Sequence, residues 1–309
     1  LIPTTAEEVK RKNARSRGLK RWGAAGVSFI ARPFWAVLRC LPLAVLAGGL
    51  LHAAEPAKKF TYKQTDRGGL QLHVFLPAGH QPGDRTSAIV FFFGGGWVSG
   101  HPGQFYPQCA YLASRGMVAM AAEYRTKNKH GTSPREAVMD AKSAIRWIRA
   151  HASELGIDPQ RIVAGGGSAG GHLAAAAGTV AGFNEPGENL SVSCVPAALV
   201  LFNPVLDNSP GGFGHEQCKA YWKDISPLYN IHVQTPPTVV FLGTADELVP
   251  VTSAQKFQSE MQALGLRCDL FLYKGQPHGF FNKAKYRETM VEADRFLNSL
   301  GLLQGSPTL

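Results

Sequence analysis

The chain has 309 residues, of which 45% are apolar and 17% are charged, a balance typical of a folded globular protein and not of a disordered chain. Its net charge of +10 is concentrated at one end: residues 1–54 carry +7, and residues 55–309 carry only +3. So small a charge over the larger part gives little support for a polyanionic partner, and we expect no binding to nucleic acid.

The first 54 residues are organised like a secretory signal. Basic residues continue to Arg39, an apolar run covers residues 41–51, and Ala53 and Ala54 precede a polar stretch. This order predicts a cleaved leader and a secreted or periplasmic protein. The apolar run is too short to span a bilayer easily, so we expect no stable membrane association after cleavage. An uncleaved anchor extended back through Phe34 is the alternative, which Arg39 disfavours, and whether residues 1–30 belong to the natural protein stays open.

Short apolar runs alternate with helical patterns from residue 60 onward. Strands are expected at residues 60–64, 70–76, 88–93, 118–123, 161–164, 197–202, 238–242 and 269–273, and helices at 104–115, 133–156, 168–181, 252–264 and 286–300. The middle strands are apolar without alternation, as strands covered on both faces should be. We therefore predict one α/β domain over residues 55–309, with a mostly parallel, doubly wound sheet of eight strands and helices on both faces.

A run of glycines follows the third expected strand. Gly94, Gly95 and Gly96 come directly after it, and Trp97 follows them. The amides of consecutive glycines can turn toward one point and donate to an oxyanion, although a plain tight turn is the alternative reading. Trp97 is either a wall of a substrate pocket or a packing residue of the loop, and the sequence does not decide between these.

A second glycine-rich motif follows the strand expected at 161–164. Gly166-Gly-Ser168-Ala-Gly170 matches the pattern G-x-S-x-G, in which a serine nucleophile sits on a sharp turn between a strand and a helix. The glycines let the turn close, and the helix N-terminus offers partial positive charge to an oxyanion. A flexible turn or a phosphate-binding loop could also be glycine-rich, but no Gly-Lys-Ser/Thr follows.

An acid and a base follow the last two expected strands. Asp246 comes after the strand at 238–242, and His278 comes after the final strand. With Ser168 they occur in the chain order Ser, Asp, His, and a loop position suits a histidine that takes up and returns a proton. Glu247 and Asp207 are the alternative candidates for the acid.

Together these motifs resemble the α/β-hydrolase superfamily, in its hormone-sensitive-lipase-like and carbohydrate-esterase-like branch, over residues 60–300. The resemblance implies the α/β-hydrolase fold with little or no cap, no metal and no diffusible cofactor. It also implies an oxyanion hole formed by the amides of Gly95, Gly96 and Ala169. The branch usually has His before its three glycines. Phe93 takes that place here, which moves this chain away from typical lipases.

The predicted function is that of a serine carboxylic-ester hydrolase that acts through an acyl-enzyme. The one sizeable insertion, residues 206–236, predicts a small lid over an open site. An open site and export favour a short-acyl or carbohydrate-linked ester, of the acetyl xylan or feruloyl type, as a small molecule or a polysaccharide. The alternatives are a serine peptidase of the same fold and a catalytically inactive binding protein. The oligomeric state stays open.

Four cysteines follow the leader, and none has metal-ligand spacing. They are Cys109, Cys194, Cys218 and Cys268. Export permits disulfides, and four cysteines allow three complete pairings, among which the sequence does not choose. We expect at least two of them to be free, buried thiols.

Overall fold

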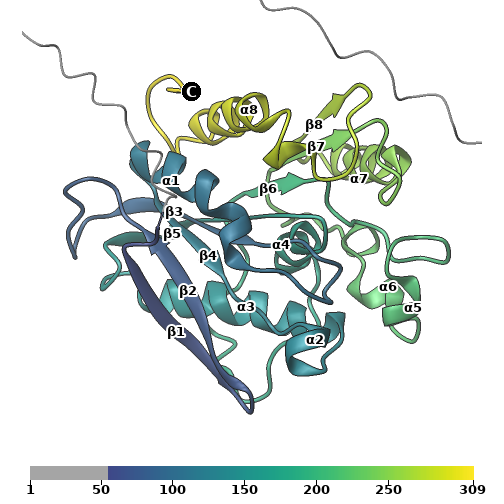
Figure 1. The fold of residues 1–309 in the computed structure, drawn as a ribbon, viewed down its shortest axis with the longest axis horizontal. Coiled ribbons are helices and arrows are strands. Elements are labelled where there is room, and N and C mark those ends of the chain that lie inside the picture. The colour runs from purple at the N-terminus through teal and green to yellow at the C-terminus, as the bar shows by residue number, and fades with distance from the viewer. Residues whose placement is uncertain (1–54) are drawn as a thin grey trace, which may run out of the picture. The chain divides into compact units, whose positions relative to one another are not determined.

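The computed structural model describes residues 55–309, so the predicted leader and signal at 1–54 lie outside the described residues. The described part is built on one eight-stranded sheet with helices on both faces (Figure 1). This confirms the predicted mostly parallel α/β architecture. Within residues 55–309, no helix is both long enough and apolar enough to cross a membrane.

The sheet has the strand order β1-β2-β4-β3-β5-β6-β7-β8. Its strands are β1 (Lys58–Thr65), β2 (Gly68–Phe75), β3 (Thr86–Phe92), β4 (Val118–Ala122), β5 (Ile157–Gly167), β6 (Leu199–Phe202), β7 (Thr238–Gly243) and β8 (Cys268–Tyr273). The pairs β1–β2 and β2–β4 are antiparallel, and every later pair is parallel. The carboxyl ends of the parallel strands therefore share one edge, where sites form in such sheets.

Two helical layers bury the sheet. Helices α1 (Tyr106–Ser114) and α8 (Tyr286–Ser299) cover one face, and α3 (Pro134–Ala150), α4 (Ala169–Thr179) and α7 (Val251–Ala263) cover the other (Figure 1). Successive β3 side chains point to opposite faces, so Phe91 packs in the α1/α8 core and Phe92 in the α3/α4 core. Because both faces are covered, β3 is apolar throughout, as the sequence indicated.

Most boundaries differ from the sequence prediction by one or two residues, and three differences have a clear local cause. Strand β5 begins at Ile157, before the apolar run that marked it, and continues through the first glycines of the motif. Helix α3 ends at Ala150, because residues 151–156 form turns that lead to Gly156 at φ 65°. The helix predicted from residue 104 begins instead as a 3₁₀ turn, Pro102–Phe105, and α1 starts at Tyr106 with a proline in its first turn.

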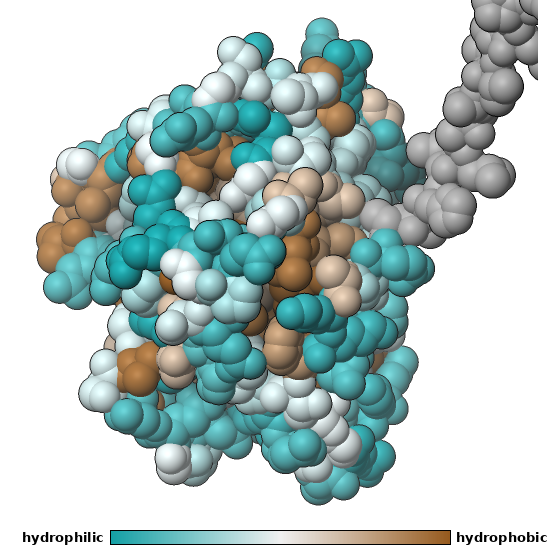
Figure 2. Space-filling model, turned by 90° about the vertical axis from the view of Figure 1, so that its left-hand side faces the viewer, coloured by the Kyte–Doolittle hydropathy of each residue, from teal (hydrophilic) through white to brown (hydrophobic). Residues whose placement is uncertain are grey.

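The segment between β6 and β7 contains the insertion at residues 206–236, which we call the lid. It holds two single-turn helices, α5 (His215–Cys218) and α6 (Trp222–Ile225), and the 3₁₀ turn Pro227–Tyr229. These, like the single turn α2 (Lys127–His130), are too short to show a helical period. The face in Figure 2 is mostly hydrophilic, with areas where apolar residues reach the surface.

The cysteines contribute to the core as thiols. All four that follow the leader are free and buried: Cys109, Cys194, Cys218 and Cys268. Burial raises the pKa of the Cys218 thiol to about 11 and that of Cys268 to about 12. These thiols are therefore protonated and unreactive at neutral pH.

Candidate active site

Ser168 occupies the sharp turn between β5 and α4. Its backbone has φ 54° and ψ −121°, a conformation that is strained for a residue with a side chain. A Cβ on Gly166 would lie 2.4 Å from the carbonyl oxygen of Gly170, and one on Gly170 would lie 1.9 Å from that of Phe92. Only glycine fits at these two positions. The amide of Ser168 donates to the Phe202 carbonyl at 2.9 Å, which fixes the turn on the neighbouring strand.

The structure brings His278 and Asp246 to Ser168. His278 Nε2 lies 2.9 Å from Ser168 Oγ, and His278 Nδ1 lies 2.7 Å from Asp246 Oδ2. The other carboxylate oxygen of Asp246 accepts from the amides of Leu248 and Val249, both at 2.9 Å. These contacts make a continuous series from a hydroxyl through an imidazole to a buried carboxylate.

Hydrogen bonding keeps Asp246 charged. Burial alone would raise the pKa of this carboxyl group, but the hydrogen bonds from His278, Val249 and Leu248 outweigh it and hold the pKa below its ordinary value. A carboxylate that accepts from Nδ1–H leaves the lone pair of Nε2 directed at Ser168. The arrangement can remove a proton from the serine hydroxyl.

Neither alternative acid reaches the histidine. In the described part of the chain, His278 hydrogen bonds to Asp246 and not to Glu247 or Asp207. Glu247 is exposed, whereas Asp207 accepts from the Ser209 amide at 2.8 Å and lines a neighbouring cavity.

The glycine loop after β3 lies against the serine. Gly94 donates its N–H to Gln104 Oε1 at 2.6 Å, whereas the N–H groups of Gly95 and Gly96 make no hydrogen bond to any residue that the structure describes. Gly95 has φ 133°, and a Cβ on it would lie 2.0 Å from the Ser99 carbonyl. Ala169 is the first residue of α4, so its N–H has no partner within the helix.

Trp97 and Phe93 pack beneath this loop. The Trp97 ring is buried, and its centroid lies 5.0 Å from that of the His172 ring and 5.9 Å from that of the Phe213 ring. Trp97 is absent from the set of described residues that line the cavity at Ser168. Of the two alternatives for Trp97, the structure therefore shows loop packing. The Phe93 ring stacks on the Tyr124 ring, and the two ring centroids are 4.1 Å apart.

The triad opens onto a cavity of about 370 Å³. Ser168, His278, the three glycines and Gln104 line it, together with Asn203, Phe213 and Leu248. No sequence motif marks Gln104, Asn203, Phe213 or Leu248 as a site residue. Asn203 directly follows the strand expected at 197–202, so the rule that sites form at strand ends could have found it. Gln104 lies in the 3₁₀ turn before α1, and Phe213 and Leu248 lie in the lid and in the loop after β7, where no local pattern indicates a site.

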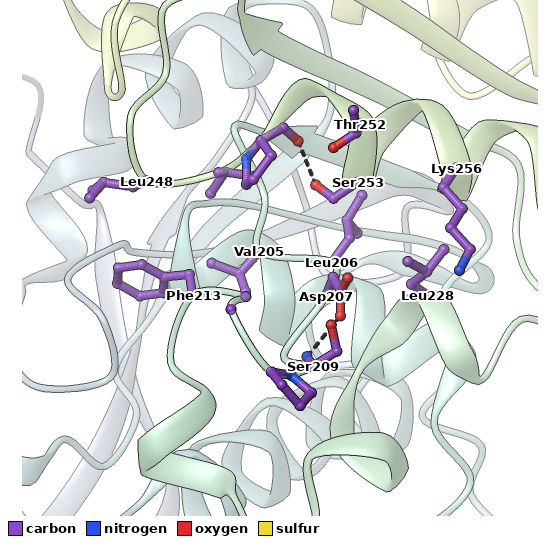
Figure 3. A pocket seen from close by; sticks show the side chains of 15 residues that line it. Val205, Leu206, Asp207, Ser209, Phe213, Leu228, Leu248, Thr252, Ser253 and Lys256 are labelled. Atoms are coloured by element: carbon purple, nitrogen blue, oxygen red, sulfur yellow. Dashed lines mark hydrogen bonds between the residues drawn. The ribbon is translucent and has the colours of Figure 1, made fainter.

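A second cavity of about 320 Å³ adjoins the first and shares Phe213 and Leu248 with it. Figure 3 shows these two side chains on one side and Lys256 on the far side, with Asp207 and Ser209 between them. The cavity beside the serine thus adjoins a second cavity that is lined in part by charged groups. No group of three or more His, Cys, Asp or Glu side chains in residues 55–309 is arranged to hold a metal ion.

Two family models match consecutive parts of the chain. The BD-FAE family matches residues 72–210, and the prolyl oligopeptidase family matches residues 206–301. Esterase LipQ of Mycobacterium tuberculosis is 26% identical over 83% of this chain and 66% of its own length. Acetylxylan esterase of Xylanibacter ruminicola is 30% identical over 74% of this chain and 47% of its own length. The chain thus spans about half to two thirds of these curated relatives.

Solved structures match over a larger share of their length. Thermogutta terrifontis esterase 2 phosphorylated by paraoxon superposes with a TM-score of 0.77 and is 47% identical, with 81% of this chain and 96% of that chain covered. The same esterase with propionate bound is 46% identical over the same shares. The sheet order, the turn at Ser168 and this similarity lead to one assignment. The chain belongs to the α/β-hydrolase superfamily, among its esterases.

Proposed function

We propose that this chain is a serine esterase that acts through an acyl-enzyme, with Ser168 as nucleophile, His278 as base and Asp246 as the acid that orients the base. One observation carries the proposal: the hydrogen-bonded series from Ser168 Oγ to His278 at 2.9 Å and on to Asp246 at 2.7 Å, at the wall of a cavity. The phosphorylation of Thermogutta terrifontis esterase 2 by paraoxon supports it, because such a reagent modifies an activated nucleophile.

In the proposed reaction Ser168 Oγ attacks the ester carbonyl carbon as its proton passes to His278 Nε2. The tetrahedral intermediate then expels the alcohol, to which His278 returns the proton, and the acyl group stays on Ser168. Water attacks the acyl-enzyme with His278 again as base, which releases the acid and restores the serine hydroxyl. Asp246 stabilises the imidazolium in both steps.

The oxyanion is assigned to the amides of Gly95, Gly96 and Ala169. Two observations support this assignment: the first two amides have no acceptor among the described residues, and the third is at a helix N-terminus. Such donors are already oriented before the reaction, and each one contributes about 3–4 kcal/mol of transition-state stabilisation in a comparable enzyme.

We assign the substrate to short-acyl or carbohydrate-linked esters, of the acetyl xylan or feruloyl type. The second cavity supports this class, because Asp207 and Lys256 offer a carboxylate and an ammonium group to an alcohol that carries several hydroxyls. Phe213 and Leu248 supply apolar surface between the two cavities. Acetylxylan esterase is among the relatives, and Thermogutta terrifontis esterase 2 has been solved with propionate and with butyrate. The signal pattern at 1–54 supports a secreted or periplasmic location, where polysaccharide is accessible.

A substrate panel tests this function. Purified protein should release acetate from acetylated xylo-oligosaccharides and p-nitrophenol from p-nitrophenyl acetate, and Ser168→Ala should lose both activities while its circular dichroism stays unchanged. Hydrolysis of peptide p-nitroanilides in preference to esters would indicate the peptidase alternative instead. Equal ester hydrolysis by Ser168→Ala would refute the nucleophile.

A further inference from the structure

Asn203 occupies a strained position at the centre of the site. It follows β6 directly, its side chain is fully buried, and its φ of 35° lies in the left-handed region. Its amide donates to the Phe241 carbonyl at 2.7 Å, which fixes this backbone between β6 and β7. Asparagine tolerates positive φ better than most residues with a side chain. Backbone geometry alone would thus accept Gly as readily, so the carboxamide needs its own explanation.

The contacts of the carboxamide determine which way it faces. Asn203 Oδ1 lies 3.1 Å from the backbone nitrogen of Gly279, and Asn203 Nδ2 lies 3.3 Å from His278 Nε2. A backbone N–H can only donate, so the atom that faces Gly279 must be the oxygen. The NH₂ group is therefore directed at the histidine nitrogen that also accepts from Ser168.

An NH₂ group in this place discriminates between the two protonation states of His278. Neutral imidazole with its proton on Nδ1 presents a lone pair at Nε2, which accepts from Ser168 and from Asn203. In the imidazolium ion Nε2 carries a proton, and two donors then face each other. Asn203 therefore complements the tautomer whose Nε2 lone pair accepts from Ser168.

Few other groups act on this nitrogen. Asp246, on the loop after β7, faces Nδ1 on the other side of the ring, and Ser168, at the end of β5, is uncharged. Among the described residues that line the cavity, His278 is the one with a titratable side chain. Asp207 and Lys256 line the second cavity, beyond Phe213 and Leu248, and their charges oppose each other.

We infer that Asn203 is a positioning residue for His278: it holds the histidine loop through Gly279 and, through its NH₂ group at Nε2, favours the ring orientation and tautomer that present a lone pair to Ser168. The inference rests on the proposed role of His278 as base. It adds Asn203, which follows β6, to a site whose nucleophile follows β5 and whose acid follows β7. The consequence is that loss of the carboxamide lowers kcat more than it changes KM.

Asn203→Asp is the sharpest test because it is isosteric. The variant keeps an oxygen for Gly279 and places a second oxygen at His278 Nε2, where a carboxylate stabilises the imidazolium. The acid limb of kcat/KM against pH for p-nitrophenyl acetate should move to higher pH by about 1–3 units. The plateau activity at high pH should fall much less than the activity at pH 6. An acid limb at the wild-type pH would overturn the inference.

Asn208→Asp is the matched control. Asn208 is also a buried asparagine, but its Nδ2 donates to the Phe213 carbonyl and does not face His278. This variant should leave the acid limb where it is, and an equal shift in both variants would mean that the effect comes from any buried charge. If Asn203→Asp does not fold, Asn203→Gly suits the positive φ and removes both contacts. It should lower kcat more than it changes KM, and wild-type kinetics would contradict the inference.

A separate measurement distinguishes this inference from the proposed function. If Ser168→Ala keeps its activity, the triad itself is wrong, whatever Asn203 does. If Ser168→Ala is inactive and Asn203→Asp has an unchanged pH profile, only the role of Asn203 fails.

Discussion

At the scale of single residues, the site depends on side chains whose contacts leave them little freedom. The Asp246 side chain is fully buried, yet it accepts from His278 and two backbone amides, so its pKa lies below the usual range. A carboxyl group with a lowered pKa contributes stability that is complete above the ordinary pKa of aspartate. That contribution is lost as the pH falls through the lowered value. Asp246 therefore stays charged throughout the neutral range in which an imidazolium needs it.

Asp246→Asn should lower kcat for ester hydrolysis by about 10⁴, as the loss of the carboxylate does in a comparable triad. An amide in place of the carboxylate favours the wrong histidine tautomer and cannot stabilise the imidazolium. Glu247→Gln and Asp207→Asn are the controls, since the structure gives His278 no hydrogen bond to either residue. All three variants are assayed with p-nitrophenyl acetate, which has no sugar hydroxyls for Asp207 to bind. A mild Asp246→Asn together with a severe effect of either control would show that another carboxylate is the acid.

At the scale of elements, a buried ion cluster joins the antiparallel edge of the sheet to the helical layer. Lys63 on β1 and Arg125 after β4 both contact Asp140 on α3 at 2.7 Å. Both also contact Glu185, in the segment after α4, at 2.5 and 2.6 Å. Burial alone would raise the pKa of Glu185. The hydrogen bond from Lys63 and the positive charge of Arg125 lower it below its ordinary value. Through Glu185, the cluster links β1 and α3 to the segment that follows α4, the helix that begins directly after Ser168.

Asp140→Asn should lower the free energy of unfolding by about 3–5 kcal/mol, because it removes the fully buried carboxylate that two largely buried cations share and leaves them only the more exposed Glu185. Asp269→Asn is the matched control. Asp269 pairs with Arg267 at 2.6 Å on the surface, and such exposed pairs contribute about 1 kcal/mol or less. Urea unfolding of both variants at pH 7 measures the difference. Equal losses would show that the cluster has no special stabilising role.

At the scale of the whole molecule, the strand count and the order of the chemical groups could be predicted from the sequence. Strands covered on both faces must be apolar along their length, and this marks β3, β4 and β7 plainly. The start of β5 is not marked in this way, because Asp158, Pro159 and Gln160 interrupt its apolar pattern.

The site was predictable only in part. Ser168, Asp246 and His278 each follow a strand and carry reactive groups, so their convergence could be expected. The side of the loop to which Trp97 turns depends on His172 and Phe213, which lie far from it in sequence. The contact of Asn203 with His278 likewise joins residues 75 positions apart. No local pattern carries this information.

The charged groups in the second cavity predict the acyl preference. An octanoyl chain would gain up to about 5 kcal/mol over acetyl if its six additional methylenes were fully buried. The second cavity could hold such a chain only beside Asp207 and Lys256, whose desolvation is unfavourable. We therefore expect kcat/KM for p-nitrophenyl esters to decrease from acetate through butyrate to octanoate. A maximum at octanoate would contradict the short-acyl proposal and indicate a lipase-like enzyme.

The most direct test of the central claim is to locate the covalent adduct. Wild-type protein treated with paraoxon and digested should carry one diethylphosphoryl group, on the peptide that contains Ser168. The loss of p-nitrophenyl acetate hydrolysis should match the fraction of protein modified, and Ser168→Ala should remain unmodified. A phosphoryl group on another residue, or full hydrolysis by protein modified at Ser168, would contradict the account.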